Sequence, residues 1–339
     1  MIYGIVLRIR HWLYDKGWKK SFPAAVPTIC VGNLTVGGTG KTPHVELLLR
    51  LLMAAEQQPA VLSRGYKRKL KGFRQVPADG SAALYGDEPV QIAHKFPQVP
   101  VAVDQDRVHG CAQLAACHPE HSRGISCVVL DDAFQYRRLQ TTLNLVLVDY
   151  NRPVFKDRLL PWGRLRDLPG RLKAAQAVIV TKCPAEVSDE DRARWRKKLK
   201  LTQEQPLFFT TLQYIAAQPV FPDADKHYLY TKQCTVFTGI ANDAPLRRYI
   251  SDTYKILQHV QFPDHHAYGK GDLRRIARAV KASATSCLIT TEKDAQRLRD
   301  CKNVPQSIRE RLFYIPVEAA FLTTEEQAAF TTLLTSTIR

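Results

Sequence analysis

The chain lacks the features of a disulfide-rich, zinc-binding or membrane-spanning protein. It has eight cysteines among 339 residues, none of them spaced CxxC, and several lie in apolar runs such as SCVVL and SCLIT. That usage is typical of buried free thiols in a reducing compartment. No run approaches the ~18 apolar residues of a transmembrane helix. Arg8 and Arg10 interrupt the first apolar stretch too early for a secretory signal, so we expect a cytoplasmic protein.

Acidic residues are scarce relative to basic ones. The sequence has 49 Lys and Arg against 32 Asp and Glu, a formal net charge of +17. This excess favours a polyanionic partner, such as nucleic acid, anionic lipid or a phosphorylated substrate, although it also serves solubility alone. An apolar fraction of 45% and a charged fraction of 24% argue against a largely disordered or fibrous chain. The length leaves room for about two domains.

The first twenty residues differ from the rest. As a helix, they collect six apolar side chains in one arc, namely Ile2, Ile5, Val6, Ile9, Trp12 and Leu13. Trp18 and three lysines follow this arc. Such a helix suits the surface of an anionic bilayer, although a helix packed on its own core has the same pattern. We interpret residues 1–22 as an amphipathic helix that associates with a membrane.

The main body alternates short apolar strands with helices. Continuous apolar strands separated by helices indicate a parallel sheet covered on both faces. The stretch 213–232 contains two prolines and has weak periodicity, so we place a hinge there. We therefore expect an α/β protein with a first domain over 23–213 and a smaller α/β domain over 214–339.

A phosphate-binding loop is predicted over 35–42, between an apolar strand and a helical run. Its sequence TVGGTGKT matches GxxxxGK[ST], except that Thr35 replaces the first glycine. The backbone amides of such a loop and the following helix N-terminus bind phosphate. The residues expected to contact nucleotide are Thr35, Val36, Gly37, Gly38, Thr39, Gly40, Lys41 and Thr42. A chance glycine-rich turn is the alternative.

Two adjacent acids, Asp131 and Asp132, end the apolar strand CVVLDD. An acid delivered beside a phosphate loop is the Walker B arrangement that holds Mg²⁺, whereas a plain turn at the strand end is the alternative. Neighbours on an extended chain point to opposite sides, so the two acids can have different roles. The run VIVTKCP lacks the aspartate of a guanine-specific NKxD, which favours ATP over GTP.

Other clusters indicate what receives the phosphate. Asp87 in GDEP begins a helical run, where it is either a helix cap or a catalytic base. His265 and His266 follow an acid in FPDHH, as a pH-tunable site or as plain surface. Basic patches at 64–74 and 164–173 either hold substrate phosphates or form a solvated face.

Seven sequence runs together resemble the tetraacyldisaccharide 4′-kinases of lipid A biosynthesis: VGNLTVGGTGKTP, SRGY, GDEP, DDAFQYRRL, LLPWGRLRDLP, FPDHHAY and TTEKDAQRL. The resemblance implies a P-loop kinase with a three-layer α/β/α core domain, a second, smaller α/β domain and an N-terminal amphipathic helix. Such an enzyme transfers the γ-phosphate of ATP to the 4′-hydroxyl of a tetraacylated glucosamine disaccharide 1-phosphate. It would be peripheral on the cytoplasmic face of the bacterial inner membrane, with no nucleic-acid partner.

The resemblance also implies residue roles. Lys41 and Asp132 would be catalytic, with Asp87 as base and His265 as its partner. Thr42, Asp131 and Asp132 would hold Mg²⁺. Further substrate contacts are implied at Arg64, Gln135, Arg166 and Asp167. Ala133 and Tyr136 depart from the glycine and histidine that family members often have. A regulatory GTPase, a metallochaperone-like P-loop protein and a nucleic-acid-binding protein are the rival classes.

Overall fold

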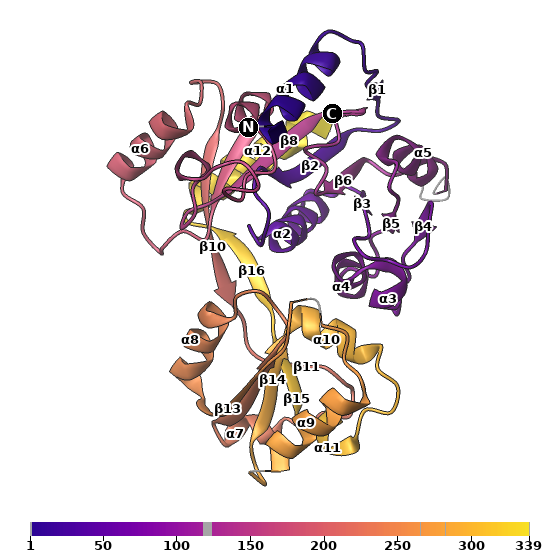
Figure 1. The fold of residues 1–339 in the computed structure, drawn as a ribbon, viewed down its shortest axis with the longest axis vertical. Coiled ribbons are helices and arrows are strands. Elements are labelled where there is room, and N and C mark those ends of the chain that lie inside the picture. The colour runs from indigo at the N-terminus through magenta and orange to yellow at the C-terminus, as the bar shows by residue number, and fades with distance from the viewer. Residues whose placement is uncertain (1, 118–123, 265, 282, 339) are drawn as a thin grey trace.

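The computed structural model describes residues 2–117, 124–264, 266–281 and 283–338. The chain forms a larger body with a nine-stranded sheet and a smaller body with a five-stranded sheet (Figure 1). His265, one of the predicted site residues, lies outside the described residues.

The larger sheet has the strand order β16-β10-β9-β8-β2-β6-β3-β5-β4. Its inner pairs, from β10 to β5, are all parallel, and the edge pairs β10–β16 and β4–β5 are antiparallel. The central strands are buried along their whole length, as their apolar runs predict. The bounds are β2 Thr28–Asn33, β3 Pro59–Ser63, β4 Arg74–Gln75, β5 Val101–Val103, β6 Cys127–Asp131, β8 Leu143–Asp149, β9 Ala177–Thr181, β10 Leu207–Tyr214 and β16 Val317–Phe321.

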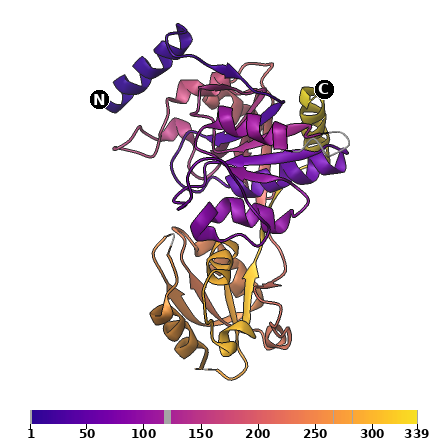
Figure 2. The same ribbon diagram turned by 90° about the vertical axis from the view of Figure 1, so that its right-hand side faces the viewer.

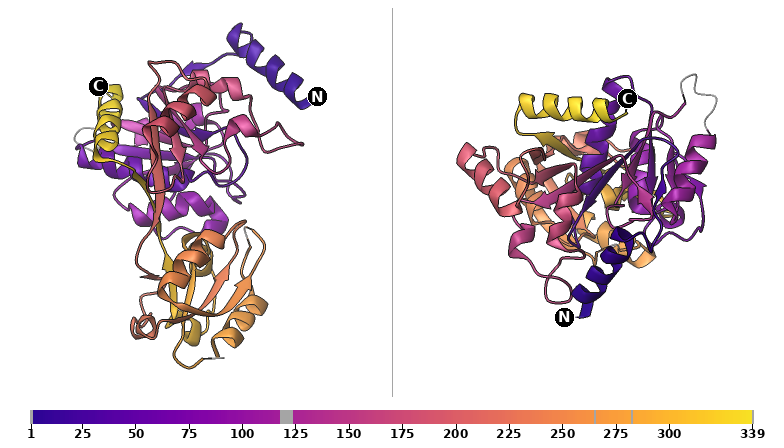
Figure 3. Two further views of the ribbon diagram at one scale, coloured as in Figure 1. Left: turned by 90° about the vertical axis from the view of Figure 1, so that its left-hand side faces the viewer. Right: turned by 90° about the horizontal axis from the view of Figure 1, so that it is seen from above.

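Helices cover both faces of this sheet, which gives the expected three layers. One core includes Leu48 of α2, Ile92 of α4 and Phe330 of α12, and the other includes Leu114 of α5 and Trp195 of α6. Figure 3 shows α1 and α12 on opposite sides of the body. The bounds are α2 Lys41–Ala54, α3 Ala82–Tyr85, α4 Asp87–Lys95, α5 Arg107–Cys117, η1 Val154–Lys156, η2 Pro169–Ala174, α6 Asp189–Leu199 and α12 Thr324–Ile338.

The smaller body has the strand order β11-β15-β14-β12-β13 and two cores of its own. β12, β13, β14 and β15 pair in parallel, so this unit is also of the α/β class. The bounds are β11 Gln218–Pro219, α7 His227–Tyr230, β12 Gln233–Thr238, α8 Ala244–Thr253, β13 Lys255–Gln261, α9 Lys270–Lys281, β14 Cys287–Thr291, α10 Glu292–Arg299, α11 Gln306–Arg309 and β15 Leu312–Ile315.

Two antiparallel strands connect the bodies. β10 leaves the larger sheet, and β16 returns to it with Tyr214 opposite Val317. Phe321 of β16 and Leu334 of α12 are then buried in a core of the larger body. The expected assignment of all of 214–339 to the smaller domain is therefore corrected, since residues from Val317 onward pair and pack with the larger sheet.

The N-terminal helix α1, Ile2–Asp15, lies at the end of the larger body farthest from the smaller one (Figures 1 and 2). A short parallel pair follows it, β1 Phe22–Pro23 with β7 Leu139–Gln140. Among the described residues, no helix combines the length and apolar character needed to cross a membrane. The seven cysteines with described side chains are free thiols, six of them buried, as predicted.

Candidate active site

The predicted phosphate loop joins the end of β2 to the start of α2. Gly40, at φ +86°, precedes Lys41 in the left-handed region, where glycine is least strained. Three contacts fix the loop from below: Asn33 Nδ2 donates to Thr39 Oγ1 at 2.8 Å, Thr181 Oγ1 donates to Thr39 O at 2.9 Å, and Lys182 Nζ donates to Gly38 O. The loop is therefore ordered by its surroundings before any ligand is considered.

Thr35, which stands where the pattern has glycine, lies in extended backbone. It forms an antiparallel bridge with Leu165, and the next amide, Val36 N, donates to Arg164 O at 2.8 Å. Extended backbone is a favourable conformation for a β-branched residue such as threonine. The loop therefore accommodates the departure from GxxxxGK[ST], because Thr35 pairs with Leu165 through an isolated β-bridge.

Asp131 ends β6 and is buried. Ser63 Oγ donates to its Oδ2 at 3.2 Å, and its Oδ1 has no hydrogen-bond partner within the described chain. Burial, and then the charges of Glu88 and Asp132, raise the pKa of Asp131 to about 7. A buried carboxylate oxygen that has no hydrogen-bond partner and lies beside a phosphate loop is typical of a cation ligand.

Asp132 follows in the left-handed conformation, at φ +52°, and makes different contacts. Arg166 Nη1 donates to Asp132 Oδ2 at 2.9 Å and its Nη2 donates to Oδ1, while Lys41 Nζ lies 3.8 Å from Oδ1. Burial opposes ionisation of Asp132, but the hydrogen bonds from Arg166 and the charge of Lys41 prevail and lower its pKa. The two acids thus have opposite pKa shifts.

Asn33 connects the residues around Asp132 to the phosphate loop, because both Arg166 and Gln135 bond to it. Arg166 Nη2 also donates to Asn33 Oδ1, and Gln135 Nε2 donates to Asn33 O at 2.6 Å. Asp167 differs, because it is fully buried and its Oδ1 lies 2.6 Å from Nε2 of His11 in α1. The predicted substrate contact of Asp167 is corrected, since a substrate cannot reach this carboxylate in the structure.

Asp87 is the first residue of α4, and Gly86 occupies the cap position before it. Arg297 of α10 donates to Asp87 Oδ2 from Nε at 3.0 Å and from Nη2 at 2.6 Å. Lys293 Nζ bonds Glu88 Oε1 at 2.7 Å and, as the main cause, lowers the pKa of Glu88. Asp87 is therefore not the helix cap, and α10 of the smaller body covers the start of α4.

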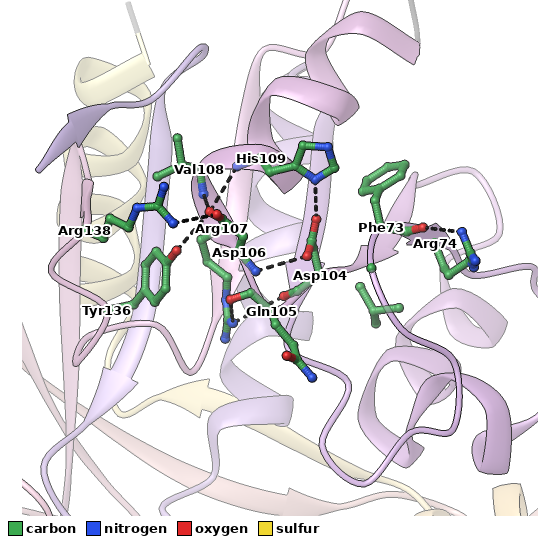
Figure 4. A network of polar contacts seen from close by, with 12 residues as sticks. Phe73, Arg74, Asp104, Gln105, Asp106, Arg107, Val108, His109, Tyr136 and Arg138 are labelled. Carbon is green, nitrogen blue, oxygen red and sulfur yellow. Dashed lines mark hydrogen bonds and ion pairs between the residues drawn. The ribbon is translucent and has the colours of Figure 1, made fainter.

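Arg107 was missed by the sequence reasoning. It begins α5 just after β5, is only 3% exposed, and lies over the ring of Tyr136 at 5.5 Å. Its Nη1 donates to the carbonyls of Asp104 and Gln105 (Figure 4). Burial and the charge of Arg64 lower its pKa, against the opposing charges of Asp131 and Asp132. Its position after an apolar strand, at the same edge as Asp131, was the available signal.

Tyr136 has a defined role although it departs from the family's histidine. Its hydroxyl donates to Asp106 Oδ1 at 2.9 Å, and Arg138 Nη1 donates to Asp106 Oδ2 at 2.6 Å (Figure 4). This network ties the segment after β6 to the start of α5.

Lys293 and Arg297 of α10 were also given no role by the sequence reasoning, although their run TTEKDAQRL was noted.

The donor set fits a divalent cation bound together with phosphate. The described residues contain no group of three or more His, Cys, Asp or Glu able to hold a metal by themselves. They do place the orphaned Asp131 Oδ1, the Asp132 carboxylate and the Thr42 hydroxyl at the phosphate loop. Mg²⁺ is commonly held by one or two carboxylates plus substrate phosphates and water, and a donor set of this kind is compatible with that ion.

Comparison with known proteins agrees with this geometry. The model of the family described as tetraacyldisaccharide-1-P 4'-kinase, LpxK, matches residues 1–339. The tetraacyldisaccharide 4'-kinase of Phocaeicola vulgatus is 39% identical over 350 residues, covering 100% of this chain and 93% of that protein. The one from Parabacteroides distasonis is 40% identical over 338 residues, covering 96% and 89%.

A solved structure has the same fold over the full chain. It is the crystal structure of the "apo" form of LpxK from Aquifex aeolicus in complex with ATP, with a TM-score of 0.76 and 28% identity. The match covers 100% of this chain and 96% of that one. The resemblance seen in the sequence runs is confirmed, and the chain belongs to the tetraacyldisaccharide-1-P 4'-kinase family.

Proposed function

We propose that this chain transfers the γ-phosphate of ATP to the 4′-hydroxyl of a tetraacylated glucosamine disaccharide 1-phosphate at the cytoplasmic face of the bacterial inner membrane. The observation that carries the proposal is the meeting of Lys41 with Asp132, 3.8 Å apart, at the mouth of an ordered phosphate loop. The start of α4, with Asp87, is part of the same larger body.

Residues 35–42 would hold the nucleotide phosphates. A Cβ built on Gly37 or on Gly38 would meet nothing within 4 Å, so the loop is open where a phosphate must approach. Lys41 would neutralise charge on the transferring group. Thr42, Asp131 and Asp132 would hold Mg²⁺, whose positive charge would help to neutralise the transferring phosphate.

Asp87 would accept the proton of the sugar hydroxyl as the bond to phosphorus forms. Arg297 holds one of its oxygens and so fixes the plane of the carboxylate. His265 remains the proposed partner of Asp87. Arg64, exposed at the carboxyl end of β3, would contact the anionic substrate, while Gln135 and Arg166 would line the site.

The outer face of α1 supports contact with the membrane. Five of the six side chains predicted for this arc are exposed, among them Ile2 at 82%, Ile5 at 51%, Ile9 at 54% and Trp12 at 47%, and the sixth, Leu13, is half-buried. A different set, Gly4, Leu7 and His11, is buried against the body. The alternative of a helix that buries its apolar arc in its own core is therefore not supported, whereas an interfacial helix needs this exposure.

The experiment is transfer from γ-labelled ATP to tetraacyldisaccharide 1-phosphate in detergent micelles. Wild type should label the lipid, and Lys41→Ala should abolish labelling. Lys197→Ala, which removes an exposed lysine of α6, is the matched control and should retain labelling. Nucleotide hydrolysis with an unlabelled lipid in wild type would overturn the proposal and point to another acceptor.

A further inference from the structure

Helix α1 makes polar contacts with the active-site framework through its inner face. Tyr3 Oη donates to the carbonyl of Arg166 at 2.9 Å, and Arg10 Nη2 donates to the carbonyl of Gln135 at 2.8 Å. His11 is 5% exposed, and its Nε2 lies 2.6 Å from Asp167 Oδ1. Each of these bonds ends on a residue that holds the site or adjoins one that does.

The proton in the buried pair can be placed from its surroundings. Arg137 Nη1 lies 3.3 Å from His11 Nδ1, and a guanidinium can only donate. Nδ1 is therefore the acceptor, so Nε2 carries the proton and donates it to Asp167. Asp167 Oδ1 also accepts the amide of Leu168 at 2.8 Å, which fixes the backbone next to Arg166.

From Arg166 and Gln135 the contacts continue into the site. Both side chains bond Asn33, which in turn donates to Thr39 of the phosphate loop. Arg166 also holds the carboxylate of Asp132, the acid beside Lys41. The route from α1 to the phosphate loop thus alternates direct hydrogen bonds with the covalent structure of Arg166, Gln135 and Asn33.

We propose that Tyr3, Arg10 and His11 are positioning residues for phosphoryl transfer, because they hold Arg166 and Gln135 in place against Asp132 and Asn33. The inference rests on the proposed function and deepens it: α1 has an outer face for the membrane and an inner face that belongs to the catalytic framework. Deleting residues 1–20 removes both roles at once, so point variants are needed to separate them.

The test compares His11→Ala with His11→Gln in the full-length chain. His11→Ala frees Asp167 and the backbone next to Arg166, which holds Asp132. Loss of an outer-shell partner of a metal site typically costs 10–100-fold, so the variant should lower kcat about tenfold, with little change in KM for ATP. Glutamine places an amide N–H near the position of Nε2, so His11→Gln should restore most of the rate. His227→Ala, at an exposed histidine 2.8 Å from Asp225, is the matched control and should leave kcat unchanged.

Binding to anionic phosphatidylglycerol vesicles separates positioning from membrane contact. His11→Ala should bind vesicles within about twofold of wild type, since His11 is buried in the body, whereas Ile5→Ser with Ile9→Ser should bind markedly less. Loss of vesicle binding in His11→Ala to the degree seen in that double variant would overturn the proposal. Unchanged kcat in His11→Ala would also overturn it.

Hydrogen exchange gives a readout that does not depend on the reaction. The amides of Arg166 and Leu168, which donate to Leu34 O and Asp167 Oδ1 at 2.8 Å, should exchange faster in His11→Ala and not in His227→Ala. If His11→Ala does not fold, Tyr3→Phe removes one hydroxyl and should lower kcat by about threefold to fivefold. Failure of wild type to label the lipid would overturn the proposed function alone. Unchanged exchange of the Arg166 and Leu168 amides in His11→Ala would overturn this inference alone.

Discussion

Arg297 of α10 donates two hydrogen bonds to a single oxygen of Asp87 in α4, across the boundary between the two bodies. The guanidinium is itself anchored, because Nη1 donates to Asp294 Oδ1 and to Gly239 O, both at 2.9 Å. Asp294 is fully buried and also accepts from Thr291 Oγ1 at 2.7 Å. The orientation of the proposed base therefore depends on a residue of the other body.

Arg297→Ala should lower the free energy of unfolding by about 3 kcal/mol, because the buried carboxylate of Asp294 keeps its hydrogen bonds from Thr291 and Gly239 but loses the cation that pairs with it. It should also lower kcat with little effect on KM for ATP. Arg297→Lys should recover only part of the lost stability and of the lost kcat, since an ammonium group cannot reproduce the several hydrogen bonds that the planar guanidinium donates. Thermal unfolding and steady-state kinetics check this, with the exposed Arg278→Ala as control. Equal stability and kcat in Arg297→Ala and Arg278→Ala would contradict the account.

His44 supports the phosphate loop from inside α2. Its Nδ1 lies 2.7 Å from Gly40 O and its Nε2 lies 2.8 Å from Thr210 Oγ1. Burial lowers the pKa of His44 to about 4, so it is neutral at pH 7. A depressed histidine pKa contributes stability above the ordinary value of 6.5 that is lost as pH falls toward 4.

We therefore expect His44→Gln to have a shallower loss of stability than wild type between about pH 6.5 and pH 4. The same variant should raise KM for ATP, because the carbonyl of Gly40 keeps the backbone amide of residue 44 but loses its side-chain partner at the start of α2. Urea unfolding at pH 7.5, 6.0 and 5.0 measures how steeply the free energy of unfolding changes with pH in each protein. Parallel slopes in the two proteins would show that His44 does not titrate as the structure implies.

Glu292 should have the opposite pH dependence. It lies with Glu46 around Lys95, whose Nζ is 3.5 Å from Glu292 Oε1 and 2.6 Å from Glu46 Oε2. Burial, and then the charge of Glu46, raise the pKa of Glu292 from 4.5 to about 7. The folded state holds this proton more tightly than the unfolded state, so stability falls as pH rises through that window.

Glu292→Gln should remove this part of the pH dependence. The stability of the variant relative to wild type should therefore be higher at pH 7.5 than at pH 5. The difference between variant and wild type isolates Glu292, because Glu46 and Lys95 are present in both. Unfolding free energies at the two pH values supply the check. A constant difference between the two proteins at both values would refute the assignment.

Two glycines offer a matched pair at the site. A Cβ on Gly32 would lie 2.4 Å from Phe134 Cβ, whereas a Cβ on Gly38 would meet nothing within 4 Å. Gly32→Ala should destabilise the chain by about 1–3 kcal/mol, because it displaces the turn that carries Asp132. Gly38→Ala should leave stability unchanged and raise KM for ATP, because a methyl group narrows the phosphate cradle. Similar stability losses in both variants would contradict this reading.

Much of the fold was predictable because its strands are short apolar runs with clear breaks. PTICVG, SCVVLDD and AQAVIVTK correspond to β2, β6 and β9, and the paired acids follow β6 as expected. The return of β16 was not predictable, because VEAAF reads equally well as a strand of either sheet. Only its pairing with β10 assigns it to the larger body.

The site residues that sequence reasoning missed act through contacts between distant segments. Arg297 and Asp87 are 210 positions apart, and His11 and Asp167 are 156 apart. Local patterns describe which residues share a strand or helix, not which helices meet. Asp167 illustrates the difference, since its motif places it near the site and only the packing of α1 shows that it faces a histidine.

The most direct test of the central claim is the position and stoichiometry of the transferred phosphate. Wild type, ATP, Mg²⁺ and tetraacyldisaccharide 1-phosphate are incubated in micelles, and ADP is measured with and without lipid while the product is analysed by phosphorus and proton NMR. We expect one ADP per lipid, a new phosphomonoester on the 4′-oxygen, and little ADP without lipid. ADP formed equally without lipid, or phosphate on any other position, would contradict the central claim.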